Sequence, residues 1–267
     1  MDKLKAILKS LVFGLIMCVF LIASALIAKA LKLTTNRTYI FQGCIMLLSI
    51  IVPLLFAGSK DIGGASIGLN MPTKKSLKDI LFYIPFIVAF IPLVVVLDKS
   101  GGIKQMVVAM FFFGCVAIAS EVYFRGLIQS LLRTKFSIIP LVVICGLIFA
   151  ACNAYYFNRI TNIKHIAILI ICSMAFAGVA TMVIEAKGNI LVLIVIDALY
   201  FFLTAYHDLP AKKLIFGQGI CLGILFIYGM YMLIRFMKEN KKDEPVIEEN
   251  NEIDDEGFNE EGNIDLS

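Results

Sequence analysis

Long apolar runs separated by short polar clusters constrain the fold of this chain more than any other feature. Eight runs follow one another, at residues 8–28, 39–57, 79–97, 105–127, 137–157, 166–184, 189–206 and 214–236. Each has about the 20 residues that an α-helix needs to cross the hydrocarbon core of a bilayer. The sequence therefore predicts an all-α fold, a polytopic membrane helix bundle with about eight transmembrane helices.

The overall composition excludes a soluble protein. Hydrophobic residues make up 60% of the 267 positions and charged residues 16%, whereas soluble domains average about half and about a quarter. The basic residues are scattered between the apolar runs, where membrane topology explains them. We therefore expect a lipid bilayer as the surrounding medium and no nucleic acid partner.

The charge divides the chain into two parts. Residues 239–267 carry twelve acidic residues and two lysines, a net charge of −10, whereas residues 1–238 carry +14. The acidic segment also lacks hydrophobic periodicity, which is typical of disorder. We predict a transmembrane domain at 1–238 and a disordered acidic cytoplasmic tail at 239–267, which either acts as a solvated tether or binds a basic cytoplasmic partner.

The distribution of Lys and Arg between alternate loops predicts the orientation. One set of loops, which includes both termini, has fourteen: Lys3, Lys5, Lys9, Lys60, Lys74, Lys75, Lys78, Arg133, Lys135, Lys187, Arg235, Lys238, Lys241 and Lys242. The opposite loops have nine. We expect a multipass protein of the plasma membrane with both termini in the cytoplasm, and a first helix that is not cleaved as a secretion signal because it is long and seven more runs follow.

Cysteine and histidine show no clustered pattern. The seven cysteines stand singly in apolar runs, and the two histidines, His165 and His207, are far apart. Disulfide frameworks and zinc sites need clustered ligands. We expect small apolar residues on membrane helices, with no metal site and no cofactor.

Four polar residues lie deep within apolar runs, where an ionisable group costs about 2.5–3.5 kcal/mol. Glu121 and Arg125 are four positions apart and share one helix face. Asn153 and Asp197 lie in later runs, and Ser120, Asn153 and Arg125 are the candidate partners of Asp197. For the Glu121–Arg125 pair taken alone, a structural salt bridge that sets helix register is the favoured interpretation. In the last run, Gly219 and Gly223 form a GxxxG pair, which indicates a close-packing face inside the bundle and is weak evidence for dimerisation.

Three segments carry a resemblance to a known family. Residues 120–126 read SEVYFRG and resemble the EExxxRG signature of the CAAX-processing and bacteriocin-processing (CPBP or Abi) family of intramembrane proteases. FAACN at 149–153 stands where that family has FxxxH. GNILVLIVIDALYFF at 188–202 resembles the stretch with its HxxxN motif, and residues 67–87 resemble its usual lead-in. The resemblance extends over about residues 62–206.

The resemblance implies a helical bundle with a membrane-embedded hydrolytic site, but several family positions are replaced. Glutamates and histidines of that family activate water to attack a peptide bond. Here Ser120 replaces the first glutamate, Asn153 and Asp197 replace the histidines, and Phe201 replaces the asparagine, while Glu121, Arg125 and Gly126 match. The site residues by resemblance are therefore Ser120, Glu121, Arg125, Asn153 and Asp197.

These substitutions leave several functional hypotheses. The first is a pseudoprotease that acts as a membrane scaffold, regulator or bacteriocin-immunity protein and binds a membrane or envelope protein or peptide. The second is an active intramembrane peptidase in which Glu121 and Asp197 share one proton as a rebuilt carboxylate pair and Asn153 holds the oxyanion. A Cys152 nucleophile and a transporter with Glu121, Arg125 and Asp197 as an ion relay are further alternatives.

Overall fold

A computed structural model describes residues 2–58, 81–97, 102–153, 163–187, 189–205 and 211–242. Within these ranges the chain is helical and contains no strand. The expected acidic tail lies outside the described residues from position 243 onward, as do His207 and most of the lead-in segment. The helices are α1 (Asp2–Ala30), α2 (Thr35–Ser49), α3 (Ile51–Gly58), α4 (Ile84–Val95), α5 (Gly102–Glu121), η3 (Val122–Ile128), α6 (Gln129–Arg133), α7 (Ile138–Asn153), α8 (Ile163–Lys187), α9 (Ile190–Ala205) and α10 (Ala211–Lys242).

Eight apolar helical stretches occur in the described ranges, in the order that the sequence predicts. Five are long and apolar enough to cross a membrane: Asp2–Ala30, Thr35–Ala57, Gly102–Arg133, Ile166–Ala186 and Ile215–Lys238. Three shorter apolar helices, Leu81–Val95, Ile138–Asn153 and Ile190–Ala205, complete the set. The predicted all-α membrane bundle is confirmed.

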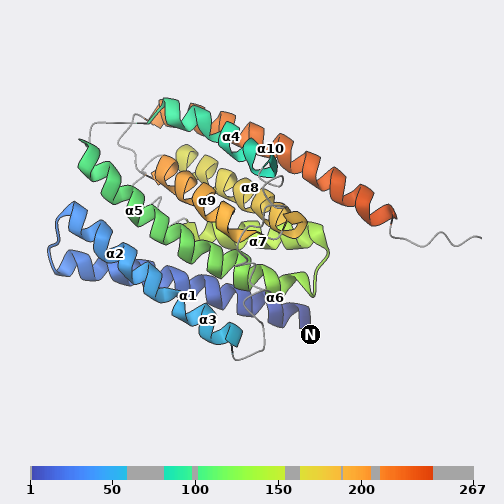
Figure 1. Ribbon diagram of the computed structural model, residues 1–267, viewed down its shortest axis with the longest axis horizontal. Helices are drawn as coiled ribbons and strands as arrows, with labels where there is room; N and C mark the ends of the chain where they lie inside the picture. Colours follow the sequence, from blue (N-terminus) through green and yellow to red (C-terminus); the bar gives the residue numbers. More distant parts are fainter. Residues whose placement is uncertain are drawn as a thin grey trace, which may run out of the picture.

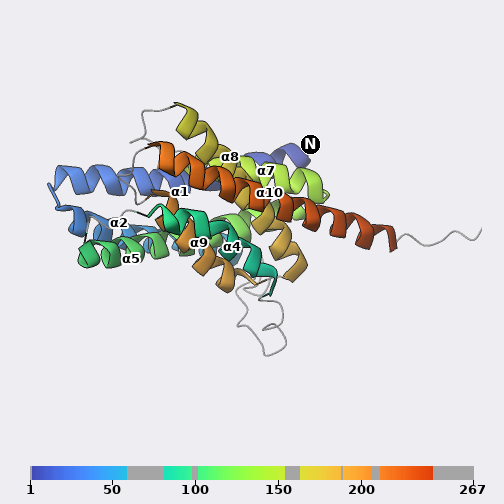
Figure 2. The same ribbon diagram turned by 90° about the horizontal axis from the view of Figure 1, so that it is seen from above.

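The helices form one elongated bundle (Figure 1). Helices α4 and α10 pack together on one side, and α1 and α2 lie on the opposite side, with α5, α7, α8 and α9 between them. The N-terminus and the last turns of α10 lie at the same end of the bundle in two perpendicular views (Figures 1 and 2).

Close helix approach occurs at glycines other than the predicted pair. A Cβ atom on Gly146 of α7 would lie 3.2 Å from the Met174 carbonyl oxygen of α8. A Cβ atom on Gly223 would meet no described atom within 4 Å, and one on Gly219 would meet only Ile168 at 3.9 Å. The expectation of close packing inside the bundle at the GxxxG pair is therefore wrong, because this pair lies on a less crowded face of α10. Dimerisation through this face stays a prediction.

The helix that carries Glu121 and Arg125 changes its hydrogen-bonding pattern between these two residues. Residues Val122–Ile128 are π-helical, while α5 before them and α6 after them are α-helical. All seven residues of the π-helical segment are buried. Segments of π-helix are rare and occur frequently at functional sites. The apolar run predicted a continuous α-helix here, so the π-helical segment is a feature that the sequence did not indicate.

Candidate functional site

The Glu121–Arg125 pair lies at the centre of the site. Glu121 Oε2 and Arg125 Nε are 3.6 Å apart, and both side chains are fully shielded from solvent. Glu121 lies twelve residues before the end of α6. At a rise of about 1.5 Å per residue, this corresponds to roughly 18 Å along the helix axis. The ion pair therefore lies well inside the bundle. The shared helix face predicted from the sequence is confirmed.

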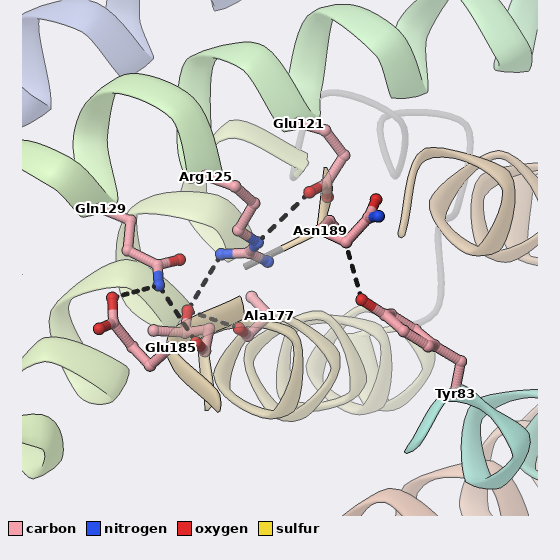
Figure 3. Close-up of polar contacts among 8 residues, drawn as sticks. Tyr83, Glu121, Arg125, Gln129, Ala177, Glu185 and Asn189 are labelled. Carbon is pink, nitrogen blue, oxygen red and sulfur yellow. Dashed lines mark hydrogen bonds and ion pairs between the residues drawn. The ribbon is translucent and has the colours of Figure 1, made fainter. Parts of the chain in front are cut away.

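Arg125 has further partners on α7 and α8. Its Nη1 donates a hydrogen bond to Thr181 Oγ1 at 3.1 Å, and its guanidinium lies 5.5 Å from the ring centroid of Phe149. Thr181 Oγ1 in turn donates to the Ala177 carbonyl oxygen at 2.8 Å. The guanidinium therefore connects η3 to α7 and α8. Figure 3 shows its contact with Glu121.

A second set of hydrogen bonds, made by Gln129, lies next to Arg125 and extends toward the end of α8. Gln129 Nε2 donates to Glu185 Oε1 at 2.8 Å and to the Thr181 carbonyl oxygen at 3.1 Å (Figure 3). Gln129, Thr181 and Glu185 were not predicted from the sequence as site residues. Gln129 had a detectable signal, because Glu121, Arg125 and Gln129 recur every four positions and so form one stripe along the helix.

The Thr181 hydroxyl should contribute to stability because it is the acceptor for a buried cation. We expect Thr181→Val to lower the free energy of unfolding by about 1.5–3 kcal/mol, the range for hydrogen bonds to charged groups. The matched control is Thr204→Val, since Thr204 donates only to carbonyl oxygens of its own helix. Thermal unfolding in detergent, followed with a dye that reacts with the buried cysteine thiols, measures both. An equal loss in the two variants would contradict this role of Thr181.

Asp197 joins the same cluster from α9. It is fully buried, and its carboxylate interacts with Glu121, Arg125 and the hydroxyl of Ser120. Of the three partners expected from the sequence, Ser120 and Arg125 are present, and Glu121 is an additional one. Two carboxyl groups from different helices thus lie beside each other, a proximity that the sequence does not reveal.

The oxygens of this cluster have few hydrogen bonds. Within the described part of the chain, neither carboxylate oxygen of Glu121, neither carboxylate oxygen of Asp197 nor the Ser120 hydroxyl makes one. The Ser120 side chain is completely buried. Buried polar atoms are ordinarily satisfied by protein, water or a bound ligand; the polar neighbours of Asp197 are the Ser120 hydroxyl, the Glu121 carboxyl group and the Arg125 guanidinium.

Asn153 is buried at the end of α7, with 2% of its surface exposed. It follows Phe149 by one helical turn, and its Nδ2 atom donates no hydrogen bond to any described residue. Beside it, the Cys18 thiol donates to the carbonyl oxygen of Cys152 at 3.8 Å. The side chain of His165 and all of His207 lie outside the described structure, so a Cys–His arrangement stays a hypothesis.

Aromatic rings enclose the cluster. Phe201, one turn after Asp197, lies parallel to Phe149 with centroids 6.1 Å apart, and Tyr200 stacks on Phe176 at 4.3 Å. Phe124 makes an edge contact with Phe149 at 5.0 Å. The charged groups are therefore held in an apolar, water-poor environment in which electrostatic interactions are strong.

Comparison with protein families supports the resemblance. A family model described as type II CAAX prenyl endopeptidase Rce1-like matches residues 102–203. Searches of curated proteins and of solved structures found no match. The matched region extends from α5 to α9 and includes Ser120, Glu121, Arg125, Asn153 and Asp197. The suspected resemblance is confirmed, and the chain is a multipass membrane protein similar to CAAX-processing proteases over this region.

Proposed function

We propose that this membrane protein is a pseudoprotease, which retains a frame similar to CAAX-processing proteases and binds a membrane or envelope protein or peptide without hydrolysing it. The observation that carries the proposal is the buried stack of Phe201 on Phe149. By resemblance, Phe201 stands at the position of an asparagine. A phenyl ring cannot donate a hydrogen bond to an oxyanion or hold an attacking water.

The surroundings of Glu121 also favour this proposal. A general base must take a proton from a water within hydrogen-bond reach. Glu121 is completely buried beside the Arg125 guanidinium, and its neighbours include a hydroxyl and a carboxylate, Ser120 and Asp197. In this role the cluster holds α5 and α9 together and maintains the surface that the partner contacts.

A second function is favoured by one specific observation, the interaction between the Glu121 and Asp197 carboxyl groups. Paired carboxyl groups that share a proton can act as acid and base in turn. In an active peptidase, one group would take a proton from water and the other would protonate the leaving amine. This hypothesis requires water and a peptide bond to reach both groups.

Peptide ends in membranes distinguish the two functions. We expect the same peptide ends in cells that make the native protein, Glu121→Gln or Asp197→Asn at equal protein levels, because neither carboxylate takes part in hydrolysis. Glu185→Gln is the matched control, since it removes a carboxylate outside the cluster. A peptide end that disappears in both cluster variants and persists in Glu185→Gln would establish the peptidase and identify its substrate.

We further propose that the protein lies in the plasma membrane with both termini in the cytoplasm, where the acidic tail contacts a basic partner. The location of both described ends at one end of the bundle supports a common side. Photo-crosslinking in intact membranes, with the full chain and with a chain that ends at Lys242, tests the role of the tail. Identical adducts from both chains would exclude the tail from partner binding.

A further inference from the structure

A group of exposed basic side chains lies where the first turns of α1 meet the turn between α6 and α7. Lys3 and Lys5 are exposed on α1, and Arg133 and Lys135 are exposed at the end of α6 and just after it. The Lys3 ammonium nitrogen lies 5.7 Å from the ring centroid of Phe136, so the two segments are in contact. We refer to these four basic side chains as the basic surface.

The backbone fixes the α6–α7 half of this surface. The N–H groups of Lys135 and Phe136 donate hydrogen bonds to the Leu132 carbonyl oxygen at 2.9 and 3.0 Å. The Leu132 side chain is completely buried, so the turn is anchored in the bundle while the basic side chains beside it are exposed. The basic surface is therefore a fixed feature of this end of the bundle.

Little negative charge is available at this end to neutralise the basic surface. Among the described acidic side chains, only Asp2 and Glu185 are near it, and the Glu185 carboxylate accepts a hydrogen bond from Gln129. Within the described ranges, the ion pair that forms is the deep one between Glu121 and Arg125, far from these exposed cations. The basic surface therefore has a net positive charge without a carboxylate partner in the described structure.

The part of the acidic tail that follows α10 has the opposite charge. Residues 243–267 contain eleven acidic residues and no lysine or arginine. They continue from the last turn of α10, which lies at the same end of the bundle as the start of α1 (Figures 1 and 2). These 25 residues span up to about 80 Å when extended, several times the ~10 Å diameter of a helix. The tail is therefore long enough to reach the basic surface.

We propose that residues 243–267 bind to the basic surface of the same molecule and cover it when no partner is present. Carboxylates form strong charge-assisted hydrogen bonds with arginine and lysine. Attachment to α10 keeps many carboxylates near this surface at a local concentration in the millimolar range, whereas lipid head groups are not attached to the protein. The contact concerns the protein without its partner, so it goes beyond the proposed function.

The position of the basic surface connects this contact to the buried site. Glu121, Arg125, Gln129 and Arg133 recur every four positions and form one stripe along the helix. A tail bound at Arg133 covers the outer end of this stripe. A basic partner that binds the tail must first displace it from Arg133 and Lys135, so partner binding uncovers this end of the bundle.

Cross-linking of amines to carboxyl groups with a water-soluble carbodiimide tests the contact in the purified full-length protein. The reaction is carried out in detergent, in nanodiscs of zwitterionic lipid and in nanodiscs with anionic lipid, and linked peptides are identified by mass spectrometry. We expect links from Lys3 and Lys5 to residues 243–267 in all three media. Their yield should fall about tenfold between about 0.05 M and about 0.5 M salt, because salt screens exposed charges.

Charge reversal assigns the contact to the basic surface. We expect Arg133→Glu/Lys135→Glu to lower the yield of links from Lys3 and Lys5 at least about fivefold, because like charges repel the tail. Both replaced residues are exposed, and an unchanged Tm confirms that the variant folds. Lys104→Glu is the matched control: Lys104 is exposed and lies 29 residues before Arg133 on the stretch Gly102–Arg133, or about 40 Å along the helix. This variant should give the native yield.

Four outcomes contradict the proposal. Absence of links at low salt, with a native Tm, would mean that the tail does not contact this surface. A native yield in Arg133→Glu/Lys135→Glu would place the tail elsewhere. Links between isotopically heavy and light chains in a mixture would make a second copy the occupant, and links that disappear only with anionic lipid would assign the surface to lipid head groups. Since no partner or peptide substrate is present, these outcomes do not depend on the proposed function.

Discussion

Replacing Arg125 by leucine should destabilise the protein more than any other change at the site. We expect Arg125→Leu to lower the free energy of unfolding by about 3–5 kcal/mol, the usual result of breaking a buried ion pair by removing one partner. The variant leaves Glu121 buried beside Asp197 without its cation, 3.6 Å from where the guanidinium was. The thiol-reactive dye assay should show a large fall in Tm and a reduced yield of folded protein.

The double variant Arg125→Leu/Glu121→Gln separates charge from packing. Removal of both charges should recover a substantial part of the lost stability, because neutral or apolar replacements for a buried ion pair are often tolerated. A double-mutant cycle gives the coupling between the two positions. A double variant that is less stable than Arg125→Leu alone would show that the contacts of Arg125 with Thr181 and Phe149, and not its charge, are the main contribution.

The second large effect is expected at Phe176, which joins four aromatic neighbours. Its ring stacks on Tyr200 at 4.3 Å and contacts Phe86 at 5.5 Å, Phe149 at 6.0 Å and Phe90 at 6.3 Å. We expect Phe176→Ala to lower the free energy of unfolding by about 3–5 kcal/mol, as for other buried phenylalanines replaced by alanine. Thermal unfolding in detergent measures the loss.

Phe226→Ala is the matched control, because this ring has 64% of its surface exposed on the outside of α10. A lipid-facing phenylalanine keeps an apolar environment whether or not the protein is folded, so we expect a change well below that of Phe176→Ala. Equal losses in the two variants would contradict the view that the aromatic contacts around α8 and α9 stabilise this bundle.

These two predictions describe complementary parts of one arrangement. The ion pair and its hydrogen bonds connect η3 to α8 through Thr181, and the aromatic rings hold α7, α8 and α9 around them. Exclusion of water by the rings strengthens each electrostatic interaction inside. A loss of the rings should therefore also weaken the polar contacts, and the Phe176→Ala variant should be less sensitive to Thr181→Val than the native protein.

Much of the fold could be predicted from the sequence, because membrane insertion depends on local hydropathy. The eight apolar runs correspond in order to the eight apolar helical stretches of the structure. The Glu121–Arg125 pair was also predictable, since residues four apart on a helix are neighbours wherever the helix lies. The π-helical turn at Val122–Ile128 was not, because hydropathy and residue spacing do not distinguish a π-helical turn from a buried α-helical one.

The candidate site was predictable only in part. Asp197 was identified as an ionisable group deep in an apolar run that needs a partner, and Ser120 and Arg125 were named among the candidates. Thr181 and Glu185 were missed. Threonine is common in membrane helices, where its hydroxyl bonds to its own backbone, and Glu185 lies near the end of α8, where a carboxylate needs no buried partner.

The sequence by itself determined the order of the apolar helices, the position of each buried charge along its helix, and the pairing of Glu121 with Arg125. Only the tertiary structure decided which faces meet: Asp197 against Glu121, Thr181 against Arg125, and Gly146 rather than Gly223 at a close helix contact. The physical reason is that lipid is as apolar as the protein interior, so hydropathy does not distinguish a lipid-facing side from a buried one. Steric fit and the few polar contacts between helices make that choice.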